Sequence, residues 1–203
     1  VALVAGNGVL GKTVQDGFGA AAQFNGPSGL VITKDNNFLY VANQGNHVIV
    51  EIDINAGSMR TVVGTAGNAA CSSGVGPAAG LNVPAYIILS PDEQYLFVSV
   101  WSCHRIAMIR RSDWSMTFVV GSGTGGYANN AVALSAQLYN PAGMAYNGDF
   151  TELYVTSYAS SWVQSLSGAS GYVKRVRGGG AGGGIDGVGS SARFERPTSA
   201  AYS

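Results

Sequence analysis

The feature that most constrains the fold is that the sequence repeats itself about every 57 residues. Prolines stand at Pro27, Pro84, Pro141 and Pro197, with spacings of 57, 57 and 56, inside the related segments "FNGPSGLVI", "LNVPAYIIL", "LYNPAGMAY" and "FERPTSAAY". Segments that recur at such a period are supersecondary units that stack on their neighbours to bury a shared core. The chain is therefore expected to be an array of similar units.

Three further landmarks keep the same register. The motifs "LYVAN", "LFVSV" and "LYVTS" begin 57 residues apart, at Leu39, Leu96 and Leu153. The acids in the preceding turns have the same spacing: Asp35, Asp92 and Asp149. Glycines close the units at spacings of 58, 57 and 57: Gly6, Gly64, Gly121 and Gly178. Because independent landmarks agree, the period reflects a structural repeat.

Each unit contains four segments that are typical of short strands. In the first unit they are residues 29–33, 38–43, 47–54 and 60–63. The first two are almost continuously apolar, as expected when both faces are covered, whereas the third alternates and has a wetter side. Turn residues such as Asp-Asn-Asn separate the first two. Four antiparallel strands per unit predict a blade of a β-propeller, an all-β fold.

The first unit resembles the NHL repeat of β-propellers. The resemblance lies in "GNGVLGKTVQDGFGAAAQFNGPSGL" (residues 6–30), followed by "LYVANQGNHVIVEID" (residues 39–53). The later units depart from it, and Ser161 stands where the third unit would carry histidine. The resemblance implies four-stranded antiparallel blades in a six-bladed ring. It also implies two classes of activity to consider, since some similar propellers are lyases or esterases and others bind RNA.

The repeat defines one propeller segment over residues 1–203. The blade units span about 24–64, 81–121 and 138–178, with partial blades at 1–8 and 194–203, so that about three and a half blades are present. An open stack would leave sheet edges unpaired, and such edges template aggregation. We therefore expect the ring to be completed by further blades of a longer chain or by another chain.

The composition restricts the partners. Charged residues make up 11% of the chain, glycine is abundant at 30 residues, and the net charge is zero. Such a surface has no long-range field to attract phosphate backbones or anionic lipids. No apolar run reaches the length of a membrane span. We expect neither nucleic acid nor membrane insertion, and the low charge favours a secreted, extracellular protein.

The two histidines are expected to be structural. His47 and His104 lie 57 residues apart, at the same place in successive units, so we expect each ring to bond a loop of the neighbouring blade. The acids Asp35, Asp92 and Asp149 are assigned to repeat geometry for the same reason. The strands that would line a central channel, "GLVIT", "AYIIL", "GMAYN" and "TSAAY", supply no His, Asp or Glu. We predict no catalytic residue, no metal and no cofactor.

The chain contains two cysteines, Cys71 and Cys103, which no repeat rule requires. In an up-and-down blade both would lie in connections that emerge on the same face, so a disulfide is feasible. It would stabilise the fold and indicate an oxidising compartment. Two buried thiols are the alternative, and no CxxC or HxxxH spacing supports zinc.

Aromatic residues gather in the connections predicted on that same face. Trp101 and Tyr158 occupy the position of Gln44 in the first unit, and Trp162 and Tyr127 are close by in the sequence. Loops on a rigid scaffold often carry recognition residues, and aromatic anchors dominate interface energetics. These five residues are the candidate binding face. Packing between blades is the alternative interpretation.

The leading functional hypothesis is a non-catalytic extracellular module for binding or structural assembly. It would present its loop face to a protein or glycan partner, including copies of itself. One alternative is a propeller lyase or hydrolase whose metal site lies in blades outside this segment. Another is an RNA-binding NHL propeller, for which the basic group at residues 174–177 gives weak support.

Overall fold

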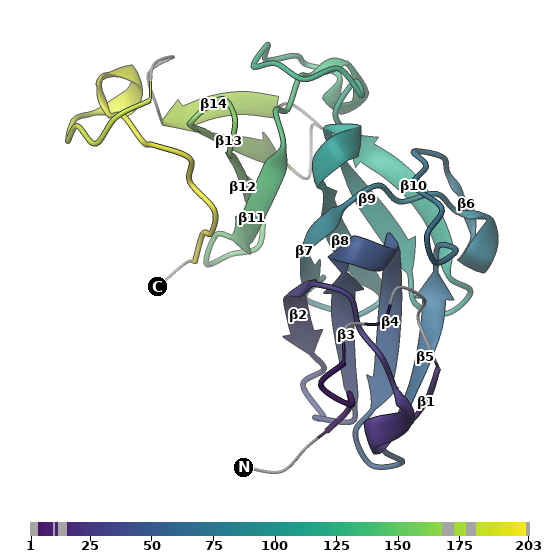
Figure 1. Ribbon diagram of the computed structural model, residues 1–203. Coiled ribbons are helices and arrows are strands. Elements are labelled where there is room, and N and C mark those ends of the chain that lie inside the picture. The colour runs from purple at the N-terminus through teal and green to yellow at the C-terminus, as the bar shows by residue number, and fades with distance from the viewer. Residues whose placement is uncertain (1–3, 10, 12–15, 168–172, 178–181, 202–203) are drawn as a thin grey trace. The chain divides into compact units, whose positions relative to one another are not determined.

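The computed structural model describes residues 4–9, 11, 16–167, 173–177 and 182–201 (Figure 1). Parts of the predicted blade units and partial blades, namely residues 1–3, 168–172, 178 and 202–203, lie outside this set. The described residues form antiparallel sheets and three-residue 3-10 turns, without an α-helix. None of these turns has the length or the apolar content of a helix that crosses a bilayer.

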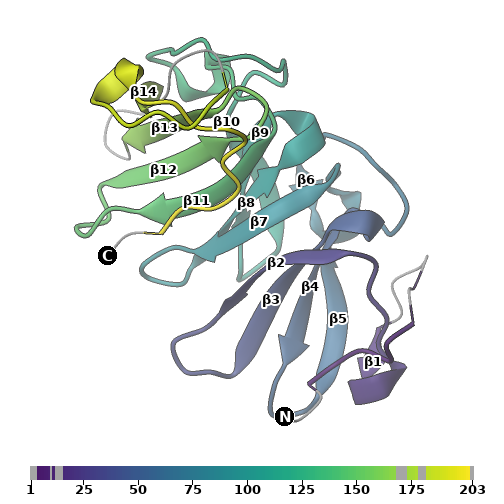
Figure 2. The same cartoon turned by 60° about the vertical axis from the view of Figure 1, so that its left-hand side comes forward.

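The first repeat forms the first sheet (Figures 1 and 2). Its strands are β2 (Pro27–Ile32), β3 (Phe38–Asn43), β4 (Val48–Asp53) and β5 (Ser58–Val63), with the outer strand β1 (Gly17–Phe18). They lie in the order β1-β5-β4-β3-β2, and all neighbours are antiparallel. The four predicted strands of this repeat are confirmed, with ends that differ by one or two residues.

The other two repeats build sheets with the same strand order. The second sheet contains β6 (Gly74–Val75), β7 (Pro84–Leu89), β8 (Tyr95–Val100), β9 (Arg105–Arg110) and β10 (Ser115–Val120), in the order β6-β10-β9-β8-β7. The third contains β11 (Pro141–Tyr146), β12 (Glu152–Ser157), β13 (Trp162–Ser167) and β14 (Val173–Arg177) in sequence order. Below, A to D denote the four long strands of each sheet in chain order.

Strands β1 and β6 are an addition to the four strands expected per blade. They come from the Gly/Ala-rich connections ahead of β2 and β7, where no strand is expected from the sequence. Each pairs with the outer side of a D strand through two residues, as Gly17 and Phe18 do with Met59 and Ser58. A 3-10 turn, η1 (Gly19–Ala21) or η3 (Gly76–Ala78), follows directly. A two-residue pairing has no periodicity from which it could be predicted.

Apolar side chains from the alternating positions form the core. In the first sheet Val48, Val50 and Ile52 are buried with Met59 from the next strand. An apolar residue stands three positions before the proline of each repeat: Phe24, Leu81, Leu138 and Phe194. Leu81 and Leu138 are completely buried, whereas Phe24 and Phe194 are half-buried.

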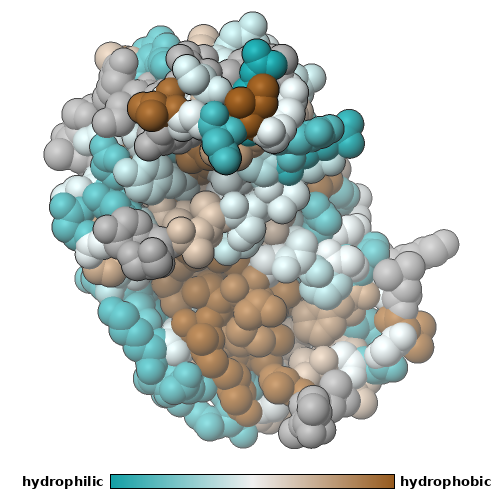
Figure 3. All heavy atoms as spheres, turned by 90° about the vertical axis from the view of Figure 1, so that its left-hand side faces the viewer, coloured by the Kyte–Doolittle hydropathy of each residue, from teal (hydrophilic) through white to brown (hydrophobic). Residues whose placement is uncertain are grey.

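Strands β2 and β7 run side by side at very short range. The Ser28 hydroxyl donates a hydrogen bond of 2.8 Å to the carbonyl of Ala85. A Cβ atom on Gly29 would lie 2.7 Å from the Cα atom of Tyr86, so that glycine is required for this approach. Figure 3 shows an apolar patch on the face of the molecule that it draws. On β2, Leu30 is 64% exposed and Ile32 is exposed as well.

The chain divides into two compact units. The first comprises Val1–Val98 and Met108–Thr117, and the second comprises Ser99–Ala107 and Phe118–Ser203. The first unit contains the whole first sheet, and the second contains the whole third sheet.

Candidate functional site

The two histidines join sequence-distant loops. Each follows a 3-10 turn, η2 (Gln44–Asn46) or η4 (Trp101–Cys103), and adopts the left-handed conformation, with φ of 60° at His47 and 53° at His104. The Nδ1 atom of His47 accepts a hydrogen bond of 3.1 Å from the backbone N–H of Val83. His104 accepts one of 3.2 Å from Asn140. In each histidine, therefore, the Nδ1 atom is bonded to the loop that leads into the next A strand.

The third repeat makes the same connection with a different side chain. Ser161 has a φ of 58° at the equivalent position, and its hydroxyl accepts a hydrogen bond of 3.4 Å from the backbone N–H of Arg196. The sequence distance spanned is 36 residues for the histidines and 35 for the serine. The bond recurs in all three repeats with either an imidazole or a hydroxyl as acceptor, which agrees with the predicted structural role.

The recurring acids act within their own turns. The carboxylate of Asp35 accepts hydrogen bonds from the Thr33 hydroxyl and the Asn37 backbone. Asp92 and Asp149 are bonded in the same way by the hydroxyl and backbone groups of their turns. The hydroxyl bonds, followed by the backbone bonds, hold the pKa of each of these carboxyls below its usual range. These hydrogen bonds of the three acids thus serve to close their own turns.

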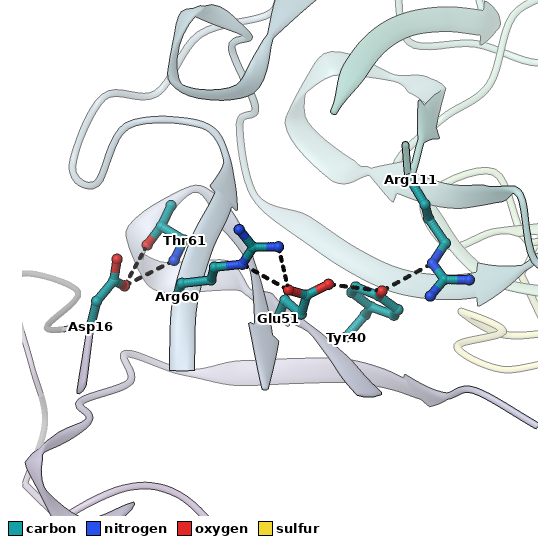
Figure 4. A network of polar contacts seen from close by, with 6 residues as sticks. All are labelled: Asp16, Tyr40, Glu51, Arg60, Thr61 and Arg111. Carbon is teal, nitrogen blue, oxygen red and sulfur yellow. Dashed lines mark hydrogen bonds and ion pairs between the residues drawn. The ribbon is translucent and has the colours of Figure 1, made fainter. Parts of the chain in front are cut away.

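The structure also contains a polar network that the sequence interpretation missed (Figure 4). Glu51 is buried on β4, and Arg60 donates to one of its oxygens at 2.7 Å. The Tyr40 hydroxyl donates to its other oxygen at 2.9 Å, and Arg111 donates to the Tyr40 oxygen at 2.9 Å. Nearer the surface, Asp16 accepts bonds from the backbone and the hydroxyl of Thr61.

Every carboxylate and hydroxyl oxygen of the buried part of this network has a partner. Burial raises the pKa of Tyr40 to about 12, so its proton is retained at neutral pH. Arg111 also donates a hydrogen bond of 2.6 Å to the carbonyl of Glu93, and its guanidinium lies over the Tyr40 ring. Tyr40 keeps its proton, and the carboxylate of Glu51 is paired with Arg60. This arrangement is typical of a structural network, whereas a group that transfers protons needs a pKa near neutral pH. The signal in the sequence was Glu51 itself, where the other repeats carry Met108 and Ser165.

Both cysteines are disulfide-bonded. Cys103 ends the turn η4 and is buried, whereas Cys71 lies in the exposed connection ahead of β7. The described residues hold no group of three His, Cys, Asp or Glu side chains placed to bind a metal ion.

The predicted aromatic residues form two pairs of contacting, tilted rings in the second unit. The ring centroids of Trp101 and Tyr158 are 4.7 Å apart with a tilt of 50°. Those of Tyr127 and Trp162 are 4.6 Å apart with a tilt of 54°. The fifth candidate, Gln44, is half-buried in η2 of the first unit. The structure brings the four aromatics together as two pairs within the second unit, whereas Gln44 belongs to the first unit.

The four rings differ in exposure. Tyr127 is 59% exposed, Trp101 and Tyr158 are half-buried, and Trp162 is buried. The guanidinium of Arg196 lies over the Tyr158 ring, 5.8 Å from its centroid. Tyr127 is thus the ring that solvent reaches most easily, and Trp162 supports it from below.

A further tyrosine belongs to the same surface, although the sequence interpretation did not select it. Tyr139 is 41% exposed, and its ring contacts His104 edge to face at 5.5 Å between centroids. The side chain of the next residue, Asn140, donates 3.1 Å to the carbonyl of Trp101. The signal was available, because the other repeats carry Asn25 and Asn82 where this repeat has tyrosine.

Comparison with known proteins supports the predicted resemblance. No protein-family model matches the chain. It is 29% identical over 212 residues to NHL repeat-containing protein 2 of Bos taurus, a match that covers 90% of this chain and 29% of that protein. It is 27% identical over 167 residues to Protein SUPPRESSOR OF QUENCHING 1, chloroplastic, of Arabidopsis thaliana, covering 81% of this chain and 16% of the relative. The chain thus spans less than a third of these relatives' length.

Solved structures share the fold. An auxiliary nutrient binding protein from Bacteroides ovatus aligns with a TM-score of 0.68 at 19% identity, over 94% of this chain and 50% of that one. A nidogen/laminin complex contains a chain that aligns with a TM-score of 0.54 at 14% identity, over 74% of this chain and 47% of that one. With the observed antiparallel sheets, these similarities confirm the β-propeller fold and the resemblance to NHL repeats.

Proposed function

We propose that this chain, a segment of an NHL-like β-propeller, is a non-catalytic extracellular module that binds a protein or glycan partner through the aromatic surface of its second unit. This surface consists of Trp101, Tyr127, Tyr139, Tyr158 and Trp162. One observation carries the proposal: the rings of Trp101 and Tyr158 contact each other at positions where the first repeat has Gln44, so repeat geometry does not require aromatics there.

Three other features support it. The buried groups that could act as an acid or a base, Tyr40 and Glu51, are hydrogen-bonded within the network. The disulfide favours an oxidising compartment, since disulfides persist mainly outside the cytosol. The similar solved structure from Bacteroides ovatus is described as a nutrient binding protein, which agrees with a binding propeller.

The proposal is tested by replacing the aromatic pair with the residue that the first repeat tolerates. A Trp101→Gln, Tyr158→Gln variant and the wild type are each used to capture partners from secreted proteins and from cell-wall polysaccharide of the source organism. We expect a partner that binds the wild type and not the variant, with little change in melting temperature. Equal capture, or a large loss of stability, would show that the pair only packs the blade.

Assembly of copies is the second candidate, and a separate observation favours it. Exposed apolar residues recur immediately ahead of the 3-10 turns in the connections, with spacings of 57, 57 and 56: Phe18, Val75, Val132 and Val188. Each of these connections thus presents an exposed apolar side chain. If they mediate assembly, a Phe18→Ser, Val75→Ser variant will sediment as a smaller species than the wild type. Identical sedimentation would reject this role.

A further inference from the structure

The surface of the second unit carries two tyrosines on neighbouring segments of one connection, residues 121–140. The backbone N–H of Gly126 donates a hydrogen bond of 3.3 Å to the carbonyl of Leu138. The backbone N–H of Gln137 donates one of 2.8 Å to the carbonyl of Ala128. Tyr127 and Tyr139 therefore extend from two segments that are hydrogen-bonded to each other. Both rings are exposed, by 59% and 41% respectively.

Each ring is supported from one side by another ring. Tyr127 packs on the buried Trp162, and Tyr139 packs on His104, whose position is fixed by the bond from Asn140. Gly125 allows the backbone of the connection to lie close to the Tyr139 ring, because a Cβ atom on Gly125 would come within 2.9 Å of that ring. A tyrosine that is held on one side and open on the other provides rigid contact area at low entropic cost.

The repeat does not require these tyrosines. Ala70 occupies the position of Tyr127 in the second repeat, and Asn82 that of Tyr139, yet the second sheet forms with the same strand order. Repeat geometry alone therefore does not explain why both positions are aromatic in this repeat, and their open sides are available to a ligand.

The connection that carries the two rings contains no charged residue of its own. From Trp114 to Gly148 the sequence contains no Asp, Glu, Lys, Arg or His. Amide side chains are frequent in this stretch, at Asn129, Asn130 and Gln137. The side-chain oxygens of Asn130 and Gln137 accept bonds from the backbone N–H groups of Val132 and Ala128, and their NH2 groups are hydrogen-bond donors. The nearest arginine of the β9 strand, Arg105, is engaged by the carbonyl of Ser122 at 2.8 Å and by the Phe118 ring. This setting suits hydroxyl groups and C–H faces better than phosphate or carboxylate.

We infer that the 121–140 connection binds an uncharged oligosaccharide, with sugar rings stacked on Tyr127 and Tyr139 and hydroxyl groups bonded by the neighbouring amides. The inference rests on the proposed binding function and specifies its ligand. A pyranose ring presents an apolar C–H face to an aromatic ring, and its hydroxyls match amide and backbone groups in both directions. A protein partner fits less well, since a polar interface rim normally supplies charges to pair.

The test is titration of the protein with neutral oligosaccharides of gluco, manno and xylo type, followed by calorimetry and tryptophan fluorescence. The variants Tyr127→Ala and Tyr139→Asn copy the second repeat, so they are expected to fold, and Tyr127→Phe keeps the ring. Phe150→Ala is the matched control, because Phe150 is an exposed aromatic in the A–B turn, at the opposite end of the third sheet. We expect about tenfold weaker binding in Tyr127→Ala and in Tyr139→Asn. The affinity of Tyr127→Phe and of Phe150→Ala should change little.

The outcomes separate this inference from the function on which it rests. If neutral sugars do not bind but a protein is captured through Trp101 and Tyr158, the ligand class is wrong and the binding function stands. If neither binds, both are wrong. Tighter binding of a uronic-acid or sulfated oligosaccharide than of its neutral counterpart would also overturn the inference. So would an equal loss in the Phe150→Ala control.

Discussion

At the scale of single residues, the bond from Asn140 to His104 makes stability depend on pH. The Nδ1 atom can accept the backbone N–H only while the imidazole is neutral, and burial lowers the pKa of His104. A histidine whose pKa is lowered on folding contributes stability that is complete above its unfolded pKa of about 6.5 and is lost as the pH falls. We expect the free energy of unfolding to fall by up to about 1 kcal/mol between pH 7 and 5, the worth of one hydrogen bond.

Chemical denaturation at several pH values checks this expectation. His104→Ser is the informative variant, because the third repeat uses Ser161 to accept the equivalent bond. Its stability should vary less over the same pH range. An unchanged pH dependence in the variant would show that another group is responsible.

Also at this scale, the buried network around Glu51 predicts a non-additive result. Glu51→Met alone leaves the Tyr40 hydroxyl and the Arg60 guanidinium without their acceptor, and we expect it to lower the free energy of unfolding by about 1–3 kcal/mol. Tyr40→Phe added to it copies Phe97 and Met108 of the second repeat. Because the unpaired hydroxyl is then removed, the double variant should lose less than the two single variants summed. Urea unfolding of all three measures the coupling, and strict additivity would contradict it.

At the scale of the elements, close approach of A strands depends on glycine. Gly29→Ala would place a Cβ atom 2.7 Å from the Tyr86 Cα and 2.9 Å from the Ala85 carbonyl, both backbone atoms that cannot rotate away. We expect β2 and β7 to separate, with a loss of about 1–3 kcal/mol, as for overpacked cores. Gly184→Ala is the control, since a Cβ there meets nothing within 4 Å. Equal melting temperatures for the two variants would contradict this requirement.

Gly143 extends the same argument to the third sheet. A Cβ atom there would lie 2.5 Å from the Cα of Ser199. Gly29 and Gly143 both stand two residues after the proline that opens an A strand. Glycine at this place therefore allows the backbone of the next repeat to pack directly against it.

At the scale of the whole molecule, the disulfide bonding of Cys71 and Cys103 contributes to stability and can be removed by substitution. In the chain-entropy model, closing a loop of roughly 33 residues stabilises the folded state by about 3–4 kcal/mol. We expect a Cys71→Ala, Cys103→Ala variant to melt at lower temperature, as the wild type does in reductant. Reductant should have no further effect on the variant. Equal stability of the two proteins without reductant would mean that the bond is strained enough to cancel its benefit.

Much of the fold was predictable, because a repeat converts local patterns into architecture. The period, the turn residues around Asp35 and the alternation after His47 are local, and they predicted the strands within one or two residues. The short strand β1 was not predictable, since Gly17 and Phe18 pair with β5 only through tertiary proximity. The aromatic surface was predicted in part, because Trp101 and Tyr158 differ from Gln44, whereas Tyr139 was overlooked although it differs from Asn82.

By itself, therefore, the sequence determined the repeat, the all-β propeller fold and the list of side chains that the repeat does not explain. The tertiary structure decided which of those side chains meet. Glu51 is a break in an apolar pattern until Tyr40, Arg60 and Arg111 surround it, and Tyr127 is one loop residue until Trp162 supports its ring. The physical reason is that periodicity is set by backbone geometry within a strand, whereas a polar network or an aromatic pair depends on segments far apart in the chain.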